Sequence, residues 1–207
     1  MIQRDIDPAR AGRARLAAIV AALVLGACAA PPKPLGRYMA PATGPTAKLV
    51  MRGSVPPGDL YGIFVFDDSE KCSGSRLAGT GSNTRNPTTT TLTANQITTV
   101  EFYLLKPNRQ FCNVRWSFTP VAGKTYLLNG GAVSANACGA RVMDMTNPEA
   151  IKLEPTALRR NPGTTTCLPL AQSKAATVAG SDAGQSAPEA VLRQGAGTED
   201  LQGLIGQ

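Results

Sequence analysis

The chain has 207 residues, 21 of them Lys or Arg, 14 Asp or Glu and none His, which gives a net charge of +7. Without histidine it lacks the imidazole that Ser-His-Asp catalysis, Cys-His catalysis and many zinc sites use, so we expect a non-catalytic protein. The basic side chains are spread along the chain, and Arg159-Arg160 is their only adjacent pair. This pattern predicts a solvated basic surface and no nucleic-acid site, which would need a basic stripe with interleaved aromatic residues.

The first 27 residues have the layout of a secretory leader. An apolar stretch at residues 16–25 precedes two small residues and follows a charged segment with four arginines, Arg4, Arg10, Arg13 and Arg15. The stretch covers about ten residues, whereas a helix that spans a bilayer needs about twenty. Pro31 and Pro32 follow and would end any helix there. The pattern therefore favours a cleaved leader over a transmembrane helix.

The run Leu25-Gly26-Ala27-Cys28 closes this leader on a cysteine and resembles the lipobox of bacterial lipoproteins. The resemblance implies cleavage before Cys28, a diacylglycerol on its thiol and an acyl chain, such as palmitate, on its new amino group. The membrane would then be a partner through this anchor. Ala29 resembles the outer-membrane default, so we expect a lipid-anchored envelope protein at the outer membrane, on its periplasmic side or at the surface. Cleavage would leave 17 basic and 12 acidic side chains, a charge of +5 that favours weak attraction to anionic lipid or cell-wall surfaces.

Residues 28–46 would form the lipidated cysteine and a proline-rich tether, which is extended and semi-rigid by composition. From residue 47 to 170 short strand-like runs alternate with turn-forming clusters. In chain order the runs are 48–51, 61–66, a threonine run at 88–91, 100–104, 112–118, 125–128, 138–142 and 151–153. A Gly/Ser/Asn-rich loop is expected at residues 79–83, and a turn at Asn129-Gly130-Gly131.

The alternation along residues 112–118 is the clearest strand signal in the chain. Cys112, Val114, Trp116 and Phe118 fall on one face, and Asn113, Arg115 and Ser117 fall on the other. In the same way, one face of the run at residues 100–104 carries Val100, Phe102 and Leu104, and its other face carries Glu101 and Tyr103. A shared face is also predicted for Cys138, Ala140 and Val142. About seven short strands separated by Gly, Pro and Asn predict an all-β fold, an antiparallel immunoglobulin-like β-sandwich. A small β-barrel is the alternative.

Four cysteines remain besides Cys28, namely Cys72, Cys112, Cys138 and Cys167. An exported chain reaches an oxidising compartment, so we expect two disulfides. The spacing permits three connectivities. We favour Cys72–Cys112 and Cys138–Cys167, which each join neighbouring segments, and the parity with Trp116 places the Cys112 disulfide against the core.

Residues 171–207 are rich in Ala, Gly, Ser and Gln and contain no aromatic residue. Such a composition predicts a disordered tail, because it buries too little apolar surface to offset the entropy of ordering. The acidic cluster of Asp67, Asp68 and Glu70 lacks the spacing of a calcium loop and is interpreted as a solvated turn. No metal site, cofactor site or catalytic motif is predicted.

These observations lead to a membrane-anchored envelope lipoprotein whose β-sandwich is a non-catalytic binding or structural module for a protein or a glycan. One alternative is a hydrolase of envelope polysaccharide that uses carboxylates alone, with Glu101 or Asp144 as a partner carboxylate. Another is an inhibitor of an envelope hydrolase, with the stretch Gly79–Thr91 entering the enzyme's active site.

Overall fold

The computed structural model describes residues 36–162, 166–176, 190–191 and 193–194. The predicted leader, Cys28 and the tether up to residue 35 lie outside the described residues. The chain divides into two compact units, residues 1–33 and 34–207, and all described residues belong to the second. Within the described part of the chain, no helix is long and apolar enough to cross a bilayer.

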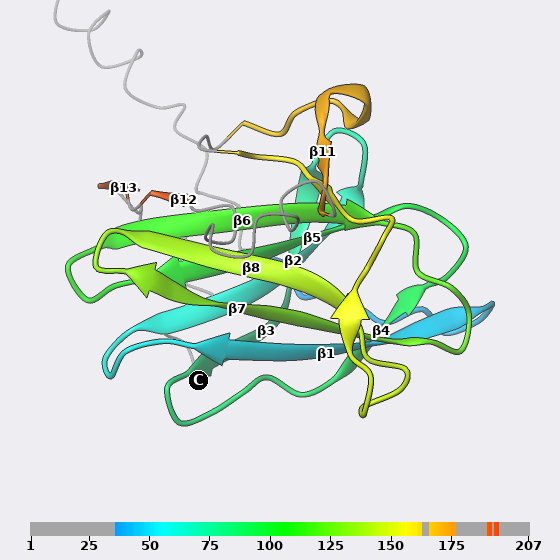
Figure 1. Ribbon diagram of the computed structural model, residues 1–207, viewed down its shortest axis with the longest axis horizontal. Coiled ribbons are helices and arrows are strands. Elements are labelled where there is room, and N and C mark those ends of the chain that lie inside the picture. The colour runs from blue at the N-terminus through cyan, green and yellow to red at the C-terminus, as the bar shows by residue number, and fades with distance from the viewer. Residues whose placement is uncertain (1–35, 163–165, 177–189, 192, 195–207) are drawn as a thin grey trace, which may run out of the picture. The chain divides into compact units, whose positions relative to one another are not determined.

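The second unit is a sandwich of two β-sheets, which confirms the predicted all-β sandwich (Figure 1). One sheet has the strand order β12-β8-β7-β1-β4, with β9 beside β8. Its strands are β1 (Thr46–Ser54), β4 (Thr90–Thr93), β7 (Thr125–Ser134), β8 (Ala137–Asp144), β9 (Lys152–Leu153) and β12 (Ala190–Val191).

The other sheet has the order β11-β10-β6-β5-β2-β3, with β13 beside β6. Its strands are β2 (Leu60–Asp68), β3 (Ser73–Ser82), β5 (Thr98–Leu105), β6 (Gln110–Phe118), β10 (Leu158–Arg159), β11 (Lys174–Ala175) and β13 (Arg193–Gln194). A short 3-10 helix, η1 (Leu170–Gln172), precedes β11. The described strands pair in antiparallel fashion except β1 and β7, which run parallel, and the strands between them in the chain form the crossover that parallel pairing requires.

The core lies between the two sheets and contains the side chains that the alternation predicts. Cys112, Val114, Trp116 and Phe118 of β6 are at most 2% exposed. The indole Nε1 of Trp116 donates a hydrogen bond of 2.9 Å to the carbonyl of Ala140 in the opposite sheet. Every residue of β5 is buried, and so is the apolar run at residues 61–66, as its composition indicates. The unit holds both sheets and this core, so it has the parts needed to fold alone.

The glycines of two stretches that the sequence predicts as a loop and a turn lie inside strands instead. Gly81 belongs to β3, where a Cβ atom would overlap the ring of Tyr61. Gly130 belongs to β7, where a Cβ atom would overlap the ring of Phe102. These glycines make room for aromatic rings that come from other strands. The sequence around each glycine therefore does not show why a glycine is needed there.

The favoured disulfide connectivity is wrong. The bonds are Cys112–Cys138 and Cys72–Cys167, with Cα–Cα distances of 6.1 Å in both. Cys112 on β6 faces Cys138 on β8 across the sandwich, and both are buried, which confirms that this disulfide lines the core. Cys72 and Cys167 lie in connections between strands and are 95 residues apart, so no local pattern in the sequence joins them.

The folded unit also continues beyond the predicted boundary at residue 170. β11 pairs with β10, and Ala176 packs in the core while its N–H donates to the carbonyl of Ala157 at 2.8 Å. Further on, β12 pairs with β8 and β13 pairs with β6. The prediction of disorder is therefore wrong for residues 171–176. Residues 177–189, 192 and 195–207 of the predicted tail lie outside the described residues.

Candidate functional site

A pocket of about 370 Å³ lies on the outer face of the seven-stranded sheet, over β2, β5 and β6. It is lined by Phe64, Phe66, Cys72, Gly74, Ser75, Glu101, Tyr103, Phe111, Asn113 and Arg115. The side chains on its strands are those that alternate with the core residues. The outer face of an antiparallel sandwich is commonly polar, so aromatic residues at these positions require a separate explanation.

Four aromatic rings form the apolar part of this pocket. The rings of Tyr103 and Phe111 stack with their centroids 5.4 Å apart, and Phe64 meets Tyr103 edge-to-face at 6.2 Å. The fourth ring, Phe66, lies under the guanidinium of Arg115 at 5.3 Å. Phe64 and Tyr103 also belong to a hydrophobic cluster that is separate from the core between the sheets. The pocket therefore has rigid aromatic walls.

The polar part is a hydrogen-bonded group on β5 and β6. Glu101 and Arg115 are cross-strand neighbours, and Arg115 Nε donates to Glu101 Oε2. Asn113 Nδ2 donates to the same oxygen at 2.8 Å. Both bonds use the same carboxylate oxygen, Oε2. The side chains of Glu101 and Arg115 are 7% and 18% exposed, which strengthens their charged hydrogen bond.

The backbone under this group is fixed by a residue from outside the sheet. Asn161, which is fully buried, accepts a hydrogen bond from the N–H of Arg115 at 2.7 Å. Its Nδ2 donates to the carbonyl of Asn113 at 3.1 Å. Asn113 and Arg115 therefore lie on a segment of β6 whose backbone is fixed by hydrogen bonds to Asn161. A fixed backbone suits a preformed binding site.

Among the described lining residues of the pocket, Glu101 is the one carboxylate. The other candidate, Asp144, lies on β8 and does not line this pocket. The acidic cluster is used as a turn: Asp68 Oδ1 accepts from the N–H groups of Glu70 and Lys71, at 3.1 and 3.0 Å. These bonds, first that of Lys71, lower the pKa of Asp68. Among the described residues no group of three His, Cys, Asp or Glu could hold a metal ion.

Asp144 has a structural role that predicts a pH dependence of stability. Burial raises its pKa, but the Lys124 ammonium 2.8 Å away and bonds from Thr146 outweigh burial and hold the pKa at about 2. Because the unfolded value of 3.8 is higher, the carboxylate stabilises the fold above pH 4. We expect about 2 kcal/mol of stability to be lost as the pH falls from 4.5 to 2.

Urea unfolding of residues 34–207 between pH 7 and pH 2 measures this loss. Asp144→Asn is the matched variant, because it removes the titrating group and keeps the shape. Its stability is expected to lie below that of the original chain at pH 7 and to meet it near pH 2. Parallel curves for the two chains would contradict the assignment.

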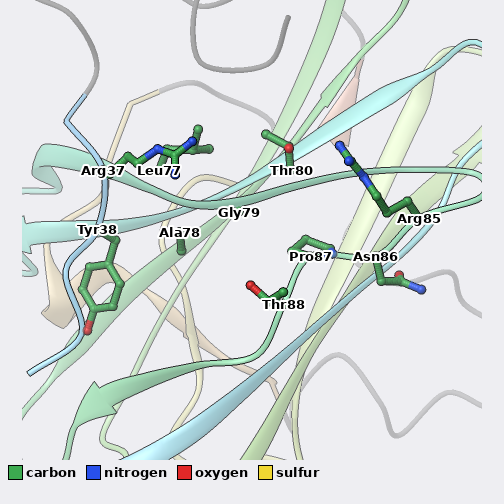
Figure 2. Close-up of a pocket in the computed structure, with 10 residues that line it drawn as sticks. All are labelled: Arg37, Tyr38, Leu77, Ala78, Gly79, Thr80, Arg85, Asn86, Pro87 and Thr88. Atoms are coloured by element: carbon green, nitrogen blue, oxygen red, sulfur yellow. The ribbon is translucent and has the colours of Figure 1, made fainter. Parts of the chain in front are cut away.

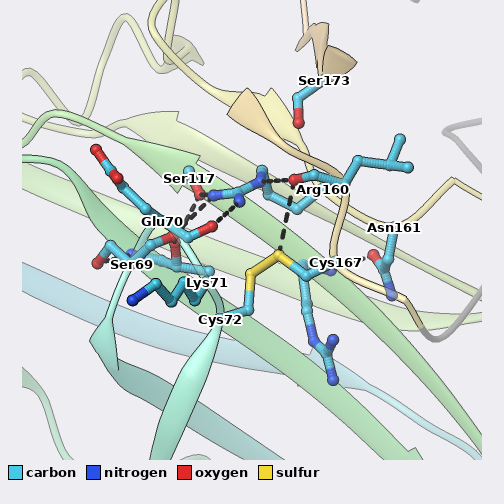
Figure 3. Close-up of a disulfide and its surroundings, with 12 residues drawn as sticks. Ser69, Glu70, Lys71, Cys72, Ser117, Arg160, Asn161, Cys167 and Ser173 are labelled. Carbon is cyan, nitrogen blue, oxygen red and sulfur yellow. Dashed lines mark hydrogen bonds between the residues drawn. A yellow bond between two sulfur atoms is a disulfide. The ribbon is translucent and has the colours of Figure 1, made fainter. Parts of the chain in front are cut away.

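The expected basic surface is corrected at Arg159-Arg160, because both side chains are buried, at 2% and 0% exposure. Arg160 donates to carbonyls of Ser69, Glu70 and Leu168 beside the Cys72–Cys167 disulfide (Figure 3). Arg159 lies with its guanidinium 5.6 Å from the ring centroid of Trp116 and has no hydrogen-bond partner among the described residues. Burial lowers the pKa of Arg159 to about 10.

The stretch Gly79–Thr91, expected as an inhibitory loop, is divided between β3, a connection at residues 83–89 and β4. Asn86 fixes the connection, since its Oδ1 accepts from the hydroxyl of Tyr61 at 2.8 Å and from the N–H of Gly53 at 3.2 Å. Pro87 lies against Gly79. The described contacts tie this loop to the sandwich, and nothing in them favours a role as a plug.

Sequence reasoning placed Glu101 and Tyr103, and likewise Asn113 and Arg115, on the faces opposite the core residues, and the structure confirms this. It did not bring them together with Phe64, Phe66 and Phe111. The sequence signal that could have identified the pocket is the aromatic and charged character of the strand faces that oppose the core residues.

No family model matches the chain, and comparisons with curated proteins and with solved structures likewise find no match.

Proposed function

We propose that the protein is a lipid-anchored lipoprotein of the cell envelope whose β-sandwich is a non-catalytic, glycan-binding module. One observation carries the choice of ligand: four aromatic rings and the Glu101–Asn113–Arg115 group line the same pocket. A sugar ring has apolar C–H faces and a rim of hydroxyls. The aromatic walls suit the first, and the carboxylate of Glu101 and the amide of Asn113 suit the second.

The environment of Glu101 supports binding rather than hydrolysis. A glycosidase needs two carboxyl groups that flank the scissile bond, and one of them must carry a proton to the leaving group. Here the described lining holds one carboxylate, Glu101, whose Oε2 accepts hydrogen bonds from Asn113 and Arg115 and so holds the polar group together. The disulfides agree with an oxidising compartment, and Cys28 would supply the anchor.

Phe111→Ala and Glu101→Gln are expected to weaken glycan binding by residues 34–207 at least tenfold each. The first removes a stacked wall, and the second removes the charge that orders Arg115 while keeping the side chain's shape. Binding is measured by calorimetry with chitotetraose, maltotetraose and cell-wall glycan fragments. Val133→Ala is the control, since Val133 is 46% exposed and lies on β7 of the other sheet.

Equal affinity in Phe111→Ala and the original chain, with both folded by circular dichroism, would overturn the glycan assignment. Release of reducing ends that stops in Glu101→Gln would replace it with the hydrolase alternative. The anchor is tested apart from the ligand: fatty-acid labelling of the full chain should be lost in Cys28→Ala.

A further inference from the structure

A second pocket, of about 280 Å³, lies at the outer edge of β3 and is rich in cationic and polar groups. Its polar lining is Arg37, Tyr38, Thr80, Arg85, Asn86 and Thr88. Arg37 and Arg85 are far apart in sequence, and Figure 2 shows their guanidinium groups on either side of Thr80. This pocket shares no lining residue with the aromatic one.

The charge of these two arginines is not neutralised by the described residues. Neither forms an ion pair there, and no carboxylate lines the pocket. The two carboxylates of β2 pair with other side chains, Asp67 with Arg76 at 2.7 Å and Asp68 with Lys71 at 3.6 Å. Two exposed guanidinium groups that converge on one hollow without a counter-charge form a site for an anion.

The edges of the pocket restrict the shape of that anion. At one end Tyr38 N–H donates to Leu77 O at 2.9 Å, and Leu77 N–H donates to Gly36 O at 3.0 Å. At the other end Ser82 N–H donates to Arg85 O at 2.8 Å. The edge of β3 is therefore occupied on both sides of Thr80, and an added peptide strand would find only a short gap. A compact anionic group fits better than an extended acidic peptide.

We propose that this pocket binds the phosphate of a lipid head group in the membrane that anchors the protein. Arg37 follows Cys28 by nine residues, so the chain can separate the anchored cysteine from the pocket by roughly 30 Å at most. Arg37, a lining residue of the pocket, is therefore close in sequence to the anchored cysteine. Two guanidinium groups match phosphate geometry. The N–H of Ser82 points away from β2 to Arg85 O, so by strand alternation the N–H of Thr80 faces the same open edge and supplies a further donor. The membrane part of this inference rests on the lipid anchor of the proposed function.

The test uses residues 34–207, which lack Cys28, so that binding reports the pocket and not the anchor. Phosphatidylcholine vesicles with 30% phosphatidylglycerol are sedimented with the protein at about 0.05 M salt. Arg37→Gln/Arg85→Gln is expected to weaken binding about 25-fold, since each arginine near an anionic surface contributes about fivefold. The matched control, Arg52→Gln/Arg141→Gln, removes the same charge from exposed positions on β1 and β8 and should change binding less than threefold.

Equal losses in the two double variants would show diffuse charge attraction and overturn the site. Failure of the original domain to sediment with the vesicles would overturn it as well. Glycerol phosphate bound in solution as tightly as the vesicles would assign the pocket to a soluble phosphate instead of a lipid. None of these outcomes depends on acylation of Cys28 or on glycan binding, which the Cys28→Ala and Phe111→Ala variants test separately.

Discussion

Replacing Arg160 with methionine is expected to lower the free energy of unfolding by about 3–5 kcal/mol. The side chain is fully buried and donates four hydrogen bonds of 2.6–2.8 Å. The acceptors are the carbonyls of Ser69, Glu70 and Leu168 and the hydroxyl of Ser117 (Figure 3). Methionine has a comparable length but no donor, so all four acceptors would lose a hydrogen bond. Among the described contacts, the Ser69 carbonyl and the Ser117 hydroxyl would keep only their bonds with Thr99.

The network extends the effect beyond one side chain. The Ser117 hydroxyl lies 2.6 Å from that of Thr99, and Thr99 bonds Ser69 through both its N–H and its hydroxyl. Arg160 thus fixes the turn after β2 to two central strands. Because groups in such networks polarise one another, the loss should exceed that of a single neutral hydrogen bond.

Urea unfolding of residues 34–207 measures this effect, with Arg141→Met as the matched control. Arg141 is exposed on β8, so its substitution should change the free energy of unfolding by less than about 0.5 kcal/mol. Arg160→Lys should fall between the two, because it keeps the charge and loses the planar set of donors. Similar stability for Arg160→Met and Arg141→Met would show that the buried network does not stabilise the fold.

Strand faces could be read from the sequence because a strand's alternation is local. The parity of Cys112 and Trp116 identified the core side of β6, and the same parity put Asn113 and Arg115 on the outer face. The candidate pocket further requires that β2, β5 and β6 be neighbours, with Phe64 opposite Glu101. That neighbourhood depends on strand order and register over long sequence separations, which periodicity does not encode.

The errors have the same origin. The sequence predicts a solvated charge at Arg160 because two of its four acceptors lie in a turn about 90 residues earlier. Gly130 reads as a turn residue because the ring of Phe102, which excludes a side chain there, belongs to the other sheet. In both cases a partner far away in the sequence determines the environment of the residue, and a local sequence pattern does not contain that partner.

Removing the Cys72–Cys167 disulfide by a double substitution to serine is expected to destabilise the fold by about 4–5 kcal/mol. The bond joins residues separated by 95 positions, and a cross-link over such a long loop strongly restricts the unfolded chain. The m-value for urea should also rise, because the unfolded chain without the cross-link exposes more surface. A loss below about 1 kcal/mol with an unchanged m-value would contradict this role.

Arg160 and this disulfide are expected to act on each other, because they hold the same two segments together. The disulfide links Cys72 to Cys167, and Arg160 links the carbonyls of Glu70 and Leu168, which are close neighbours of the two cysteines. Without the disulfide these segments can separate, so their carbonyls can reach water once the guanidinium is gone. Arg160→Met should therefore cost about 1–2 kcal/mol less in the double-serine chain than in the original. A double-mutant cycle from urea unfolding measures this coupling, and additive losses would mean that the two links stabilise the fold independently.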